Sequence, residues 1–152
     1  MKTMLYAALV VALAVAGLSL WVRLAPSDTA YWNAALPVDR TALSGPCAQQ
    51  ISKIPKGAAA TCLLPGDPAS VLTKLATRAA ATPRTTLLSG TPQEGRMTWI
   101  SRSKLMGYPD YITAQATSAK SGTRLDILSR QRFGSGDRGV NAARLTQWLS
   151  SF

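Results

Sequence analysis

Two segments of the chain, residues 101–111 and 129–141, hold most of the charged and polar side chains that could bind a ligand. The members that carry this chemistry are Arg102, Asp110, Arg130, Arg132, Asp137 and Asn141. A guanidinium group can donate two parallel hydrogen bonds to a carboxylate or a phosphate. The arginines therefore suit either of two roles. In the first they would bind an anionic ligand, a lipid headgroup or an acidic partner. In the second they would pair with Asp110 and Asp137 in a network that stabilises the fold.

The strands that hold these segments decide which of the residues meet. In an antiparallel meander, the end of a strand at 96–104 lies beside the start of a strand at 111–117. We expect the end of a strand at 124–132 to lie at the opposite end of the middle strand. The sequence leaves open whether Arg102 converges in space with Arg130 and Arg132.

Catalytic chemistry has little support in the sequence. The chain contains no histidine, so the commonest general base and metal ligand is missing. Ser103 and Lys104 would point to opposite faces of a strand, and the spacing brings no two carboxylates together. We expect a protein that is not an enzyme, with no catalytic residue, no cofactor and no metal site.

A glycine-containing loop at residues 134–139 precedes an expected helix and could hold an anion on its backbone N–H groups. The loop lacks the Lys-Ser/Thr ending of a P-loop. Asp137 also stands where a capping side chain is expected, and it would compete with an anion for the same N–H groups. We therefore interpret the loop as a flexible connection followed by a helix cap.

Cys47 and Cys62 are the two cysteines of the chain. Two thiolates are too few for a cysteine-only zinc site within one chain. In an oxidising compartment they would form a disulfide, worth about 3 kcal/mol for a loop of this length. In a cytoplasmic domain they would remain two buried thiols. We expect the disulfide, because the N-terminal segment indicates an extracytoplasmic domain.

Residues 4–22 form an uncharged and almost wholly apolar run. As a helix this run would extend about 28 Å, close to the hydrocarbon thickness of a bilayer. Trp21 and Tyr6 stand near its ends, where amphipathic rings favour the headgroup region. The alternatives are a signal peptide, with late cleavage near Ala30, and a buried helix of a soluble protein. We expect a retained transmembrane anchor, because the bulky residues after the run disfavour signal peptidase.

The positive charges predict the membrane topology of the chain and the kind of surface that its domain would contact. Lys2 precedes the apolar run and Arg23 is soon balanced by Asp28, so the positive-inside rule favours a cytoplasmic N-terminus. We expect a single-pass protein of the inner (cytoplasmic) membrane with its domain in the periplasm. The chain has a net charge of +10, but its cations are dispersed, so nucleic acid is not an expected partner. A basic domain beside a membrane is attracted to anionic headgroups or to an acidic partner.

Composition divides the chain into three parts. These are an N-terminal transmembrane anchor at 1–24, an irregular arm with prolines and glycines at 25–57, and a folded domain at 58–152. The aromatic residues of the arm are expected to pack on the domain, so the arm would not be a free linker.

The domain itself reads as a strand, a helix, a run of strands and a closing helix. Strands are expected at 58–64, 85–89, 96–104, 111–117 and 124–132. Asp67 and Pro68 can begin a helix that ends before Pro83, and Asp137 can cap a closing amphipathic helix. This order predicts an α+β fold, in which two amphipathic helices pack on one face of an antiparallel sheet.

Residues 98–111 and 128–144 resemble the bacterial family known only as domain of unknown function 1499. The core of the resemblance is Ser129-Arg130-Gln131-Arg132 followed by Gly134, Asp137, Gly139 and Asn141. The segment 20–28 also resembles membrane-anchored members of this family. The resemblance covers 20–32 and 63–150, without the two cysteines, and it implies no established activity, cofactor or catalytic residue.

Two functions are consistent with these features. The first is a membrane-anchored extracytoplasmic accessory or assembly subunit, with the lipid bilayer and a membrane protein complex as partners. Ala8, Ala12, Ala16 and Gly17 would permit close packing of the anchor against another transmembrane helix, although contact with lipid explains them equally well. The alternative is a binding module for an anionic ligand or a lipid headgroup that uses Arg102, Arg130 and Arg132.

Overall fold

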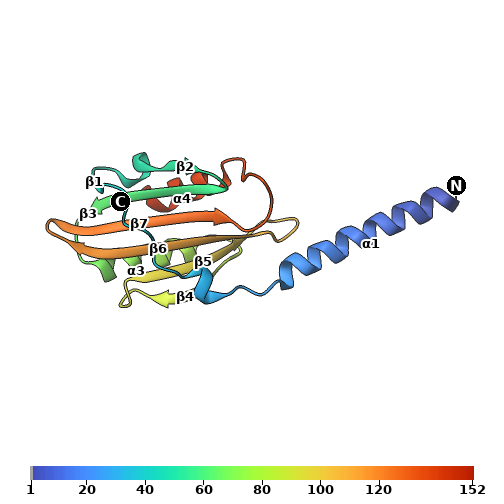
Figure 1. Ribbon diagram of the computed structural model, residues 1–152, viewed down its shortest axis with the longest axis horizontal. Helices are drawn as coiled ribbons and strands as arrows, with labels where there is room; N and C mark the ends of the chain where they lie inside the picture. The colour runs from blue at the N-terminus through green and yellow to red at the C-terminus, as the bar shows by residue number, and fades with distance from the viewer. Residues whose placement is uncertain (1) are drawn as a thin grey trace.

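The computed structural model describes residues 2–152 and has the expected α+β architecture (Figure 1). A long helix, α1 (Lys2–Leu24), projects from one end of a domain built on a seven-stranded sheet. The other elements are α2 (Thr29–Trp32), β1 (Leu43–Ser44), the 3-10 helix η1 (Cys47–Gln50), β2 (Ser52–Ile54), β3 (Gly57–Leu64), α3 (Pro68–Ala80), β4 (Thr85–Thr91), β5 (Arg96–Arg102), β6 (Pro109–Ala119), β7 (Gly122–Gln131) and α4 (Val140–Leu149).

The strands β4, β5, β6 and β7 form the expected antiparallel meander, and β3 pairs antiparallel with the free side of β7. The sheet is mixed and not wholly antiparallel, because β1 runs parallel to β3. The strands β1 and β2, with α2 and η1, lie in the segment that was expected to be irregular. Elements of two to four residues are too short to produce a detectable hydrophobic period.

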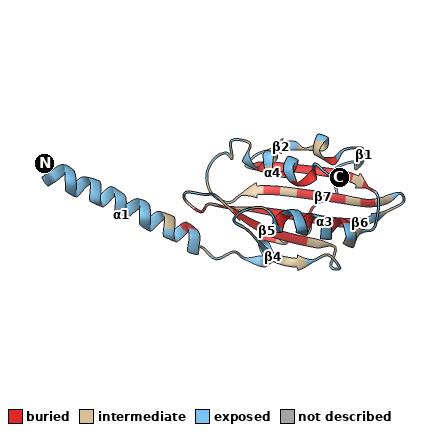
Figure 2. Ribbon diagram, turned by 180° about the vertical axis from the view of Figure 1, so that it is seen from behind, coloured by how far each residue is buried: buried red, intermediate tan, exposed pale blue. Residues whose placement is uncertain are grey.

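One face of the sheet is covered by α3 and α4, as predicted, and this layer forms the main core. Trp99 of β5 packs edge-on against Trp148 of α4, with ring centroids 5.5 Å apart. The helix α3 begins where the sequence indicates, because the Asp67 carboxylate accepts a hydrogen bond from the N–H of Ser70 (N···O 2.9 Å). Figure 2 shows the buried residues concentrated in the strands and in the inner sides of these helices.

Cys47 and Cys62 form the expected disulfide, with Cα atoms 5.5 Å apart. Both cysteines are fully buried in the main core. The bond joins η1 to the middle of β3, so it holds the end of the arm against the edge of the sheet where β1 and β2 pair.

The other face of the sheet is covered by the arm, as its aromatic residues predicted. Trp32 stacks on Tyr111 of β6, with ring centroids 3.6 Å apart and planes within 5° of each other. The backbone carbonyl of Trp32 accepts a hydrogen bond from the hydroxyl of Thr113 (2.9 Å). Trp32 is only 8% exposed, whereas the neighbouring Tyr31 is 62% exposed. A single indole ring therefore provides most of the aromatic contact between arm and sheet.

The helix α1 is long and apolar enough to cross a bilayer, or to serve as a signal sequence. Its last turns contact two loops of the domain. The hydroxyl of Ser19 donates to the carbonyl of Met106 in the β5–β6 loop (3.3 Å), and Trp21 packs on Phe133 after β7, with ring centroids 5.5 Å apart. The remaining side chains of α1 are almost all exposed, as Figure 2 shows.

We predict that Trp32→Ala lowers the free energy of unfolding of the domain by about 3 kcal/mol, because it removes a buried ring and uncovers Tyr111. The matched variant Tyr31→Ala, which removes an exposed ring from the same helix, should cost less than about 1 kcal/mol. Urea unfolding of the detergent-solubilised full chain, followed by far-ultraviolet circular dichroism, measures both values. Equal losses would contradict the assigned role of Trp32.

Candidate functional site

The candidate residues gather at the end of the sheet that lies nearest α1. The register pairs Asp110, at the start of β6, with Ser101 near the end of β5 and with Gln131 at the end of β7. The prediction that the end of β7 lies at the opposite end of the middle strand is therefore wrong. Both β5 and β7 are antiparallel to β6, so they run in the same direction and end at the same edge.

The candidate side chains divide between the two faces of the sheet, because successive residues of a strand point to opposite sides. Asp110 faces α4, whereas Arg102 and Arg130 lie on the face that the arm covers. Of the two roles that the sequence left open for the three arginines, pairing with Asp110 and Asp137 is not seen in the described residues. Within residues 2–152 the ion pairs are Arg124–Asp126 and Arg144–Asp110.

Arg130 and Arg132 hold the arm to the sheet. Arg130 Nη2 donates to the carbonyl of Trp32 (3.2 Å), and its guanidinium lies 4.9 Å from the centre of the indole ring. Arg132 Nη1 donates to the carbonyl of Pro26 (2.8 Å). Burial lowers the pKa of Arg130 from its ordinary value, but a guanidinium remains charged at neutral pH. Both side chains are thus engaged in fixing the arm.

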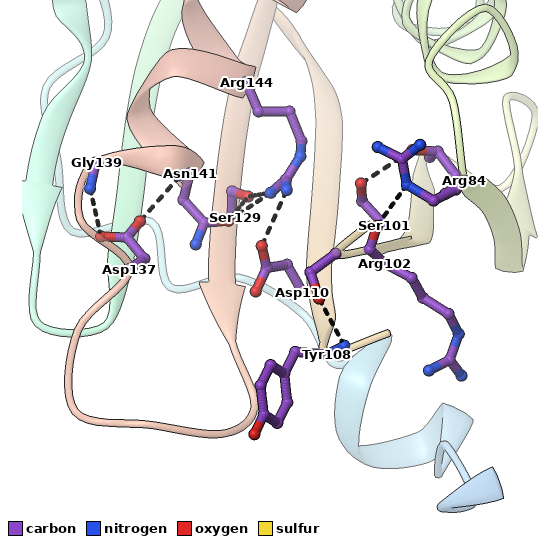
Figure 3. A network of polar contacts seen from close by, with 12 residues as sticks. Arg84, Ser101, Arg102, Tyr108, Asp110, Ser129, Asp137, Gly139, Asn141 and Arg144 are labelled. Atoms are coloured by element: carbon purple, nitrogen blue, oxygen red, sulfur yellow. Dashed lines mark hydrogen bonds and ion pairs between the residues drawn. The ribbon is translucent and has the colours of Figure 1, made fainter. Parts of the chain in front are cut away.

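A polar network connects the start of β6 to α4 (Figure 3). Arg144 Nη2 donates to Asp110 Oδ2 (2.9 Å), and Arg144 Nη1 donates to Asn141 Oδ1 (2.6 Å) and to Ser129 Oγ (3.2 Å). Ser129 and Asn141 are fully buried and hydrogen-bond each other. Burial raises the pKa of Asp110, against the opposing effect of the Arg144 charge. Asp110 and Asn141 therefore belong to one structural network, but its cation is Arg144.

Asp137 caps α4 from the preceding loop. Its carboxylate accepts hydrogen bonds from the N–H groups of Gly139 (3.0 Å) and Asn141 (2.9 Å), shown in Figure 3. Partial burial raises the pKa of Asp137, but these hydrogen bonds together outweigh it and hold the pKa below its ordinary value. The N–H groups that could have bound an anion in this loop are thus occupied by Asp137.

A basic pocket opens beside the end of α1. It measures about 290 Å³, and its lining residues are Arg23, Arg84, Thr86, Arg102, Ser103, Lys104 and Gly107. The residues come from α1, from the α3–β4 loop, from the strands β4 and β5, and from the β5–β6 loop. Ser103 and Lys104 lie beyond the end of β5, so the expectation that they alternate across a strand does not apply to them. The Ser103 hydroxyl accepts a hydrogen bond from the N–H of Tyr108 (3.0 Å).

Backbone contacts position the arginines of this pocket. Arg84 has φ +59°, in the left-handed region, and its Nε donates to the carbonyl of Arg102 (3.2 Å; Figure 3). Arg102 Nη1 donates to the carbonyl of Gly107 (3.0 Å), and Arg23 Nη2 donates to that of Leu105 (2.9 Å). A Cβ at Gly107 would lie 2.7 Å from Arg23 Cγ, so a larger residue at this position would displace the Arg23 side chain from the loop.

Of the three arginines that the sequence singled out, Arg102 alone lines the basic pocket. Sequence reasoning missed Arg23 and Arg84, because they lie on elements that only the tertiary fold brings together with Arg102. Lys104 stands within the segment 101–111, but it was considered there only as a partner of Ser103. Sequence reasoning also missed the role of Arg144, although Asn141 and Arg144 are three positions apart on one helix, a spacing that places side chains on the same side.

These features define a small α+β domain with an N-terminal apolar helix and with the basic pocket beside the end of that helix. The chain belongs to the family described as Protein of unknown function (DUF1499), whose model matches residues 38–152. The match confirms the resemblance seen in the sequence and extends it over both cysteines, while α1 and Trp32 lie outside it. Comparisons with curated proteins and with solved structures found no match.

We predict that Asp137→Ala lowers the free energy of unfolding by about 1 kcal/mol at pH 7, because it removes the acceptor for two N–H groups at the start of α4. The folded-state pKa of Asp137 is lowered, so its charge stabilises the protein above about pH 4. This contribution of the Asp137 charge to the free energy of unfolding is lost as the pH falls through the folded-state pKa. The unfolding curves of wild type and variant should therefore converge in acid.

Urea unfolding at pH 7 and at pH 3 tests this expectation. The control is Asp39→Ala, which removes an exposed carboxylate and should change stability little at either pH. A difference between Asp137→Ala and wild type that is independent of pH would contradict the assigned role of the charge.

Proposed function

We propose that this protein is a membrane-anchored periplasmic domain without catalytic activity, which serves as an accessory or assembly subunit of a larger membrane protein complex. The observation that carries the proposal is the contact between the domain and the end of α1. Ser19, Trp21 and Arg23 all bind loops of the domain, so the apolar helix points outward in a fixed direction. The domain is therefore held in one orientation relative to α1, as a subunit of a complex would be, and is not joined to it by a flexible linker alone.

The exposure of α1 supports a retained anchor. Leu9, Leu13 and Val15 are about half to two-thirds exposed, and a helix that is apolar on all sides needs lipid or another protein around it. The contacts of α1 with the domain also give its C-terminal turns a structural role, which a cleaved signal peptide would not have. The buried disulfide supports a periplasmic domain, because disulfides persist in oxidising compartments.

The engagement of the acidic side chains supports a function without catalysis. Asp110 is paired with Arg144, and Asp137 accepts hydrogen bonds from two backbone N–H groups. Each carboxylate at the edge of the sheet therefore already has a structural partner. A general base needs a free acceptor within reach of its substrate.

The small residues of α1 support a protein partner within the membrane. Ala8, Ala12 and Ala16 recur at four-residue spacing and so share one side of the helix. Small side chains permit two transmembrane helices to approach closely. The opposite side mixes small and large residues, because it carries Val10 and Trp21 as well as Ala14 and Gly17.

We predict that affinity purification of the full chain in a mild detergent recovers a membrane protein partner in stoichiometric amount. The double variant Ala12→Leu/Ala16→Leu should lose this partner, because larger side chains prevent close helix packing. The matched variant Val10→Leu/Ala14→Leu, which enlarges the opposite side, should retain it. A fusion of alkaline phosphatase to the C-terminus should be active, since this enzyme folds in the periplasm.

Recovery of the protein alone would contradict the role of a subunit, and an inactive fusion would contradict the periplasmic location. Equal effects of the two double variants would exclude the alanine side of α1 as the contact surface.

A second candidate function, the binding of an anionic group, is favoured by the basic pocket. Its residues differ from those expected, because Arg130 and Arg132 hold the arm and only Arg102 contributes to the pocket.

A further inference from the structure

We propose that the basic pocket between α1, β4, β5 and the β5–β6 loop binds the phosphate of an anionic phospholipid from the adjoining leaflet. The inference rests on the proposed membrane anchorage and adds to it a specific ligand, which does not depend on a protein partner.

The charge of the pocket favours an anion. Its lining includes three arginines and a lysine, and no acidic residue lines it. Neither of the ion pairs formed within residues 2–152 involves a residue of the pocket. Four cations that share a small space repel one another, and a phosphate oxygen among them relieves this repulsion through charge-assisted hydrogen bonds.

The arginines are held in place while part of their hydrogen-bonding capacity stays available. Arg102 uses Nη1 for the carbonyl of Gly107, and Arg84 uses Nε for the carbonyl of Arg102. A guanidinium group has five N–H donors, so each side chain retains donors for a ligand.

The position of the pocket selects a lipid as the source of the anion. Arg23 is the next-to-last residue of α1 and lines the pocket. A helix of this length reaches the headgroup region at its ends, where arginine is the expected residue. The pocket therefore opens at the depth of the lipid phosphates if α1 spans the bilayer.

An exposed apolar side chain beside the pocket supports the same surface. Leu105 is 82% exposed at the tip of the β5–β6 loop, next to Lys104, and its carbonyl accepts the hydrogen bond from Arg23. A leucine flanked by cations suits the boundary between headgroups and acyl chains, where an apolar group leaves water and the cations meet phosphates. An enclosed site for a free phosphate ion would have no use for it.

The test uses native mass spectrometry of the full chain in a nonionic detergent with short-chain phosphatidylglycerol or short-chain phosphatidylcholine. We expect one phosphatidylglycerol molecule to bind, at least about tenfold more tightly than phosphatidylcholine. The variant Arg102→Gln/Lys104→Gln should lose at least about tenfold in affinity, because two cations near the lipid phosphate are removed. The charge-matched control Lys74→Gln/Lys120→Gln, at exposed positions away from the pocket, should bind as the wild type does.

Each contrary result overturns the proposal. Equal binding of the two lipids, or equal loss in both double variants, would mean that there is no specific site. Displacement of the lipid by millimolar inorganic phosphate would identify a free anion as the ligand. Equal thermal unfolding of the variants and the wild type is required, so that lost binding cannot be assigned to misfolding.

The same spectra separate this proposal from the proposed function. The intact mass reports whether residues 2–24 are retained, and their loss would contradict the anchor. Binding of phosphatidylglycerol by a chain that recruits no partner protein would support the lipid site and count against the accessory subunit.

Discussion

The stacking of Trp32 on Tyr111 is the contact on which the position of the arm depends. The helices α3 and α4 protect one face of the sheet, and the other face is covered by a segment with little regular structure. The carbonyl of Trp32 accepts hydrogen bonds from Thr113 and Arg130, and the ring contacts both Tyr111 and the Arg130 guanidinium. These contacts fix the chain just after α1. The direction of α1 and the position of Arg23 at the basic pocket are set by the contacts of Ser19, Trp21 and Arg23 with the loops of the domain.

The sheet then determines how charge is distributed at this end of the domain. Because β5 and β7 end at the same edge, arginines from distant parts of the sequence lie close to α1. Alternation along the strands sends Asp110 to the helix-covered face and Arg102 and Arg130 to the other. Asp110 pairs with Arg144 and Asp137 caps the start of α4, whereas the basic pocket keeps an excess of positive charge beside α1.

The sequence predicted what local signals and hydrophobic period control. Asp67 and Pro68 marked the start of α3, and alternation marked the long strands within two residues of their ends. The short strands β1 and β2 escaped prediction, because they exist only through pairing with β3. The site was predicted less well. Arg102, Arg130 and Arg132 look alike in sequence, but their partners depend on which segment the fold places over each of them. Arg130 and Arg132 bind backbone carbonyls of the arm, whereas Arg102 lines the basic pocket.

The most direct test of this account measures the depth of the β5–β6 loop relative to the bilayer. Because the native cysteines form a disulfide, a single cysteine introduced by Leu105→Cys or by Lys120→Cys can be labelled with a fluorophore in the full chain. After reconstitution in nanodiscs that contain headgroup-quenching lipids, the account predicts strong quenching of the label at position 105. It predicts little quenching at position 120, in the β6–β7 turn. Equal quenching at both positions, or none at 105, would contradict a domain held against the membrane by its anchor.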